Sequence, residues 1–158
     1  MEFYTIGVYN STEKEFFKKL TNNNIDTFCD IRQRRGVRGS KYSYVNSNRL
    51  QEILNDLEIK YGHIIGLAPT TEIRELQIEA DVQQGELKRD RNKLDKEFIL
   101  AYKEKILKKF NIEEFFEKLD NAGTSKVVLF CVEEKPEACH RSIVTEKLEN
   151  LGYKVTHL

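Results

Sequence analysis

Strand-like segments alternate with helical segments along almost the whole chain, and this order constrains the fold more than any other feature. The strand-like segments are rich in β-branched and aromatic residues and occupy positions 3–9, 24–31, 59–65, 126–132 and 153–158. Strands separated by helices pair in parallel, because right-handed crossovers carry each helix over one face of the sheet. We therefore predict an α/β fold with three layers, in which helices cover both faces of a mostly parallel central sheet.

The segments between the strands carry the start signals and the apolar spacing of helices. Thr12, followed three residues later by Glu15, has the spacing of a capping box at the start of one helix. In the stretch SNRLQEILNDL, at 47–57, the leucines and the isoleucine recur at spacings of three and four and form one apolar stripe. Both patterns predict helices that pack one face against the sheet.

One segment interrupts the regular alternation. The stretch at about 70–95 is rich in charges and helical in propensity, with a helix break expected at Gly85 and a new helix expected from Asp95. We call residues 70–95 the helical excursion. A chain of 158 residues fits one domain of ordinary size. We therefore predict a single α/β domain over residues 1–158 that includes this helical excursion.

Charge and cysteine content limit the classes of partner and compartment. Lys plus Arg and Asp plus Glu both number 26, so any contact with a polyanion must come from a local cluster. No window approaches the roughly 18 uninterrupted apolar residues of a membrane span, and the N-terminus lacks a signal-peptide pattern. Three cysteines, an odd number, fit a reducing compartment better than a disulfide framework. We predict a cytoplasmic protein with no membrane partner.

Basic residues crowd the loop that follows the second predicted strand. Arg32, Arg34, Arg35 and Arg38 lie within seven positions, and Lys41 follows them. The guanidinium group presents a fixed fork of donors that suits phosphate or carboxylate oxygens. We therefore predict that Arg32 and Arg38 bind an anion. The alternative is a solvated basic loop whose arginines pair with surface glutamates.

The stretch EEKPEACHRS, at 133–142, follows the most apolar strand of the chain. Pro136 is suited to the start of a helix, whose free N–H groups and partial positive charge attract anions. Arg141 would add a charged donor in the first turn. Because the carboxyl ends of parallel strands meet at one edge of a sheet, we expect this stretch to face the basic loop at 32–41, which we call the arginine loop. Arg141 is therefore the third predicted anion-binding residue.

Four residues at the same edge are candidates for catalysis. Glu133 is either a proton-transfer group or a carboxylate that orients an arginine. Cys139 is either a nucleophile or a packed thiol, and its spacing to Arg141 differs from that of a phosphatase loop. His140 would donate hydrogen bonds from the position next to Cys139. His63 ends the third predicted strand, where it suits either acid–base work or a structural role.

The sequence gives no metal motif. A site would have to draw on Cys131, Cys139, His140, His63 or Glu133, yet neither a C-x-x-C pair nor an H-E-x-x-H helix is present. Within a helix, the adjacent Cys139 and His140 would point about 100° apart. We therefore predict no metal and no cofactor.

These motifs resemble the domain of unknown function 488 family of bacteria and archaea. The resemblance rests on TIG near the start, DIR after the second strand, YGH after a helix and, most specifically, CVEEKPEACHRS. The matching positions are Asp30, Arg32, Arg38, His63, Cys131, Glu133, Pro136, Cys139, His140 and Arg141. The resemblance implies a compact three-layer α/β domain with these residues gathered in one strand-end cleft, and it implies no settled reaction. Val8 and Tyr9 depart from the polar pair that usually follows TIG.

The residues leave three functions in view. One is an enzyme that acts on a phosphate-containing substrate, such as a nucleotide or a nucleic-acid end, held in a strand-end anion-binding cleft. The second is a non-catalytic domain that binds nucleic acid or a nucleotide, using Tyr42 and Tyr44 together with the basic residues of segment 88–93. The third is an accessory protein that binds a partner through the helical excursion. The sequence does not decide whether the protein is an enzyme.

Overall fold

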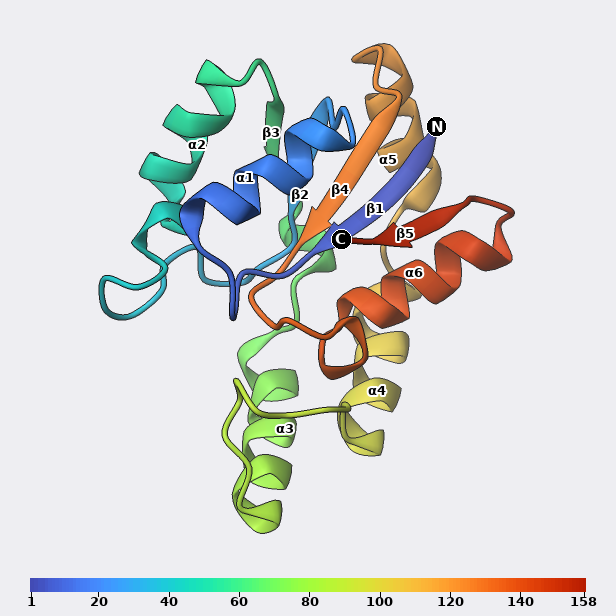
Figure 1. Cartoon of the computed structure of the whole chain (residues 1–158). Coiled ribbons are helices and arrows are strands. Elements are labelled where there is room, and N and C mark those ends of the chain that lie inside the picture. Colours follow the sequence, from blue (N-terminus) through green and yellow to red (C-terminus); the bar gives the residue numbers. More distant parts are fainter.

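A computed structural model describes all residues, 1–158, and shows five parallel strands in one sheet (Figure 1). The strands are β1 (Glu2–Ile6), β2 (Thr27–Asp30), β3 (Lys60–His63), β4 (Lys126–Phe130) and β5 (Val155–His157). Their order across the sheet is β3-β2-β4-β1-β5. The strand at the centre, β4, therefore pairs with both β1 and β2.

Six α-helices connect and cover the strands. They are α1 (Glu13–Asn22), α2 (Ser47–Asp56), α3 (Thr71–Gln84), α4 (Lys96–Tyr102), α5 (Ile112–Asn121) and α6 (Arg141–Asn150). Helices α1 and α2 lie on one side of the sheet, whereas α5 and α6 lie on the other (Figure 1). The predicted three-layer α/β fold is confirmed. No helix has the combination of length and apolar composition that crossing a membrane requires.

Local signals in the sequence set several helix ends. The Thr12 side chain accepts a hydrogen bond from the Glu15 N–H at 3.2 Å, and the Glu15 carboxylate accepts one from the Thr12 N–H at 2.8 Å, which completes the predicted capping box. Gly85 ends α3 with a φ of 68°, a conformation that glycine adopts without strain. Asp95 caps α4. The two helices α3 and α4 pack together and extend beyond the carboxyl edge of the sheet (Figure 1).

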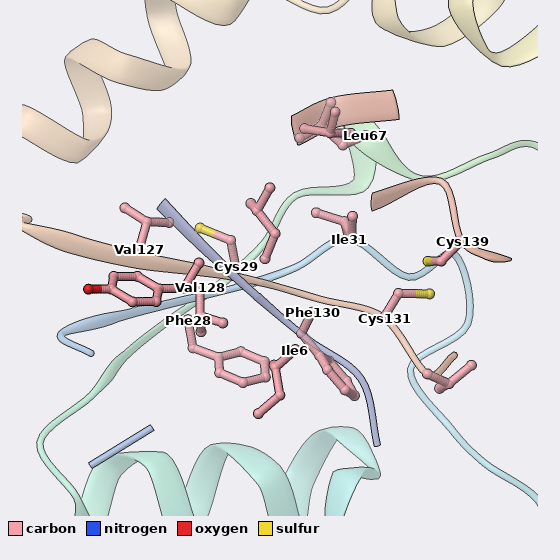
Figure 2. Packing of buried hydrophobic residues seen from close by; sticks show 14 of the residues in the cluster. Ile6, Phe28, Cys29, Ile31, Leu67, Val127, Val128, Phe130, Cys131 and Cys139 are labelled. Atoms are coloured by element: carbon pink, nitrogen blue, oxygen red, sulfur yellow. The ribbon is translucent and has the colours of Figure 1, made fainter. Parts of the chain in front are cut away.

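The core surrounds β4, which is inaccessible to solvent on both faces. Val127, Val128, Leu129 and Phe130 are all fully buried, as the continuous apolar run predicts for a central parallel strand. On one face, the Phe130 ring packs against Phe28 and Phe16 with centroids 5.2 and 5.5 Å apart. Figure 2 shows the side chains of β2 and β4 packed together in this cluster.

The segment after β4 differs from the predicted helix that starts near Pro136. Pro136–Ala138 forms a single 3₁₀ turn, Cys139 returns to an extended conformation, and α6 begins only at Arg141. Ala138 and Cys139 are both about 1% exposed, so tertiary packing holds this segment against the sheet. The proline starts a 3₁₀ turn rather than the expected helix, and the buried Ala138 and Cys139 delay the α-helix until Arg141.

Candidate functional site

A cavity of about 450 Å³ lies at the carboxyl edge of the sheet. Its walls come from the loops after β1, β2 and β4 and from the helical excursion. The chain leaves β4 toward α6 on one face, whereas it leaves β1 and β2 toward α1 and α2 on the other face. Crevices form where neighbouring strands send their connections to opposite faces, and this is where α/β proteins bind their ligands.

Arg32 is held in place by a buried ion pair. Its Nε and Nη2 atoms donate to the two carboxylate oxygens of Asp30 at 2.8 and 2.7 Å, and Nη2 also donates to Val45 O at 2.9 Å. The Tyr61 hydroxyl donates to the same Asp30 carboxylate at 3.0 Å. The guanidinium lies over the Phe130 ring, 4.6 Å from its centroid. Only Nη1 of this buried arginine has no hydrogen-bond partner.

Glu133 is part of a second buried charge network, which links the β4 loop to the helical excursion. Arg91 donates to Asp81 at 2.7 Å, to Glu133 at 3.2 Å and to Ala138 O at 2.9 Å. The Lys88 ammonium lies 3.4 Å from the same Glu133 oxygen. Burial alone would raise the pKa of the Glu133 carboxyl, but the charges of Lys88 and Arg91 hold it well below its usual range.

The second carboxylate oxygen of Glu133, Oε2, is buried and has no hydrogen-bond partner. Glu133 is about 6% exposed and lines the cavity. Buried carboxylate oxygens normally accept hydrogen bonds, because leaving one unpaired costs free energy. This atom is therefore an acceptor available to a ligand donor.

Arg141 lies outside the cavity wall. Its guanidinium is about 1% exposed, and Nη2 donates to Glu133 O at 2.6 Å and to Glu134 O at 3.2 Å. These bonds fold the loop after β4 back onto the start of α6. The structure therefore gives Arg141 a role in shaping the loop, and its contact with an anion stays a prediction.

Gly7 allows the loops after β1 and β4 to approach each other closely. A Cβ atom at this position would lie 1.9 Å from Glu133 O, far inside van der Waals contact. We expect Gly7→Ala to lower the free energy of unfolding by about 1–3 kcal/mol or more, because the backbone must shift to accept the methyl group. Urea unfolding measures this loss.

Gly62→Ala is the matched control for Gly7→Ala. A Cβ at Gly62, within β3, would meet its nearest neighbour, Ile64 Cδ1, at an ordinary 3.5 Å. This variant should keep wild-type stability. Equal stability of the two variants would show that the close approach at Gly7 is not a constraint.

Cys131, Cys139 and His140 form a compact buried group in the wall of the cavity. Their potential ligand atoms all lie within 4.8 Å of one another, and the Cys139 Sγ is 3.8 Å from the His140 Nδ1. The Cys131 and Cys139 side chains project toward each other (Figure 2). Contact with Cys139, together with burial, raises the pKa of the Cys131 thiol well above its usual value. Cys131 alone is thus a poor nucleophile.

The predicted site residues divide into two groups. Arg32, Arg38, Glu133, Cys139 and His140 line the one cavity. His63 does not line it. Its half-buried ring instead forms a hydrogen bond through Nε2 with the backbone oxygen of Arg32 at 2.8 Å.

Several cavity residues were not among the predicted catalytic and anion-binding residues, although Lys88 and Arg91 belong to the basic segment 88–93 that was considered for nucleic-acid binding. They come mainly from the helical excursion and are Arg74, Gln77, Asp81, Lys88 and Arg91. In the sequence, nothing separates Arg91 from the exposed Arg89 two positions before it. The one available signal is Gly85, because a chain that reverses there can return the residues after it toward the sheet.

Comparison with known proteins gives one match. The family model described as "Domain of unknown function DUF488" matches residues 12–148. No curated protein and no solved structure matches the chain. The matched range contains the arginine loop, the helical excursion and the group formed by Cys131, Cys139 and His140.

Proposed function

Because this chain belongs to the domain of unknown function DUF488 family, whose description assigns no reaction, we propose a function from the cavity itself: it binds a phosphate-containing ligand of nucleotide size. The observation that carries the proposal is the charge of the cavity wall. Six cationic residues line it, namely Arg32, Arg34, Arg38, Arg74, Lys88 and Arg91, against two acidic residues, Asp81 and Glu133. A crevice lined mainly by one sign of charge concentrates ligands of the opposite sign.

The two cations best placed to hold a phosphate are Arg34 and Arg38. Both are exposed at the cavity mouth, and no ion pair of the molecule involves either one. Arg32 and Arg91 are already paired with carboxylates, so they contribute rigidity more than free donors. Fork-shaped guanidinium groups without a partner suit the oxygens of a phosphate.

Aromatic side chains and Glu133 suit the rest of a nucleotide. The Tyr9 and Tyr42 rings both line the cavity, with centroids 5.4 Å apart. Aromatic rings give a base a surface on which to stack. The free Oε2 of Glu133 can accept a hydrogen bond from a sugar hydroxyl. The cavity volume also falls in the range of small-molecule sites.

A catalytic function at the same cavity is the second candidate. It is favoured by Glu133, whose buried, unpartnered carboxylate oxygen would touch the ligand directly. We place either function in the cytoplasm, because all three cysteines are free, as expected in a reducing compartment. Formation of product from a bound nucleotide by the wild-type protein, and its loss in Glu133→Gln, would show that the protein is an enzyme rather than a non-catalytic binding domain.

The arginine pair provides the test of binding. We expect the double variant Arg34→Ala, Arg38→Ala to bind a nucleoside monophosphate at least tenfold more weakly than wild type, since each charge-assisted bond contributes about 1.5–3 kcal/mol. Stability should change by no more than about 0.5 kcal/mol, because both side chains are exposed. Isothermal titration at low and moderate salt gives both the affinity and its salt dependence.

Arg35→Ala is the matched control, because Arg35 carries the same charge in the same loop but does not line the cavity. Its affinity for the nucleotide should stay within a few-fold of wild type. The proposal fails if wild type shows no saturable binding to inorganic phosphate, nucleoside monophosphates or short oligonucleotides. It also fails if Arg35→Ala weakens binding as much as the double variant does.

A further inference from the structure

We propose that Cys131, Cys139 and His140 bind a zinc-type transition-metal ion whose fourth coordination position faces the cavity. This inference is independent of the proposed nucleotide, since the three residues form the site without any ligand. All three are about 5% exposed or less, and all three line the cavity. Two thiolates and one imidazole are a donor set that zinc prefers, and an open fourth position is typical of catalytic zinc.

The distances suit a tetrahedral ion. With zinc–sulfur bonds of about 2.3 Å and zinc–nitrogen bonds of about 2.0 Å, neighbouring ligand atoms should lie roughly 3.5–3.8 Å apart. The Cys139 Sγ and the His140 Nδ1 are 3.8 Å apart, and no pair in the group exceeds 4.8 Å. Small side-chain rotations are enough to close the site around an ion.

The histidine is already oriented as a metal ligand. Its Nε2 lies 3.0 Å from Ile31 O, and because a carbonyl oxygen only accepts, Nε2 carries the proton and donates it. In the neutral ring, Nδ1 then directs its lone pair toward the sulfur atoms. Metal-bound histidines usually donate their other N–H to a carbonyl or carboxylate in this way.

The sulfur atoms also have support from outside the group. The Arg141 backbone N–H lies 3.5 Å from the Cys139 Sγ, where it can stabilise a thiolate. When the metal binds, each thiol loses its proton to solvent, and the two thiolate charges balance the charge of Zn²⁺. The buried site then has no net charge, which limits the cost of removing the ion from water.

The sequence indicated no metal site partly because Cys139 and His140 were expected to lie in one helix. That expectation is wrong, because Cys139 is extended, with φ −139° and ψ 147°, and His140 only caps α6. The extended residue lets two adjacent side chains reach the same point. Cys131 then joins them from the end of β4, which no local motif could indicate.

Cobalt substitution tests the proposal on the whole protein. The reduced, chelator-treated chain should bind one Co²⁺, with the thiolate-to-cobalt absorption and strong visible bands of a tetrahedral site, and Zn²⁺ should displace it. Zinc at about a hundred times its Kd should raise the unfolding midpoint by roughly 5–10 °C. X-ray absorption at the zinc edge should show two sulfur neighbours at about 2.3 Å.

Cysteine variants identify the ligands. Cys131→Ala and Cys139→Ala should each lose more than about 100-fold in cobalt affinity, beyond the loss expected for an outer-sphere partner. Cys29→Ala is the control, because Cys29 is equally buried but is not part of the group. Absence of thiolate-to-cobalt absorption in wild type overturns the proposal, as does an unchanged spectrum in Cys131→Ala. If these variants do not fold, a wild-type zinc edge without sulfur neighbours overturns it equally.

Discussion

Replacing Asp30 with alanine is expected to lower the free energy of unfolding by about 3–5 kcal/mol, because it leaves the guanidinium of Arg32 buried without its anion. Asp30 is fully buried, and Arg32 is about 3% exposed. The only hydrogen-bond acceptor left to the Arg32 side chain would be Val45 O. A loss of this size corresponds to a fall of roughly 10 °C in the unfolding midpoint. Urea unfolding and calorimetry measure the two quantities.

A double variant distinguishes the cost of burying an unpaired Arg32 from the net contribution of the Asp30–Arg32 ion pair to the free energy of unfolding. Asp30→Ala combined with Arg32→Met should recover a substantial part of the loss, since buried pairs replaced by apolar side chains are often nearly neutral. The exposed Asp56, in the last turn of α2, gives the control variant Asp56→Ala, which should be close to wild type. A double variant at least as unstable as Asp30→Ala would contradict this explanation.

Arg91→Met should release the helical excursion from the rest of the domain. Arg91 bridges Asp81 and Glu133, both of which are buried, so its removal leaves two carboxylates short of a cation. We expect a local loss of about 3–5 kcal/mol, which makes backbone amides of α3 exchange with deuterium at least about 100-fold faster. Hydrogen exchange followed by mass spectrometry locates the change.

The neighbouring Arg89 provides the control. Its side chain is 71% exposed and its nearest carboxylate, that of Asp90, is 3.8 Å away and also exposed. Arg89→Met should leave the exchange rates of α3 unchanged, because exposed ion pairs contribute little. The interpretation is refuted if the α3 amides of both variants exchange at the same rate, or if the α3 amides of Arg91→Met exchange as slowly as those of wild type.

The layers of the fold could be predicted because local sequence carries their signals. Four consecutive fully buried residues in β4 appear in the sequence as a continuous apolar run, and the Thr12 capping box starts α1 where the spacing indicates. Pro136 was predicted to start a helix, but it starts only a 3₁₀ turn. The start of α6 could not be read in the same way, since the burial of Cys139 against the sheet determines it.

The cavity was only partly predictable for the same reason. Strand-end position brought Arg32 and Glu133 together as expected, because parallel strands share their carboxyl edge. Arg91 reaches that edge only after the chain reverses at Gly85, and its two partners, Asp81 and Glu133, lie 10 and 42 residues away in the sequence. In a charge-rich segment such as this one, the buried charged residues cannot be told from the exposed ones in the sequence until the partner of each is known.

The central position of β4 also has a consequence for how the protein is made. β1 and β2 are synthesised first, yet they do not pair with each other, because β4 lies between them. In a nascent chain that stops before Lys126, β2 can pair with β3, but β1 has no neighbouring strand to pair with. Contacts between such distant segments also slow folding. The cavity, which needs the loop after β4, is completed among the last parts of the molecule.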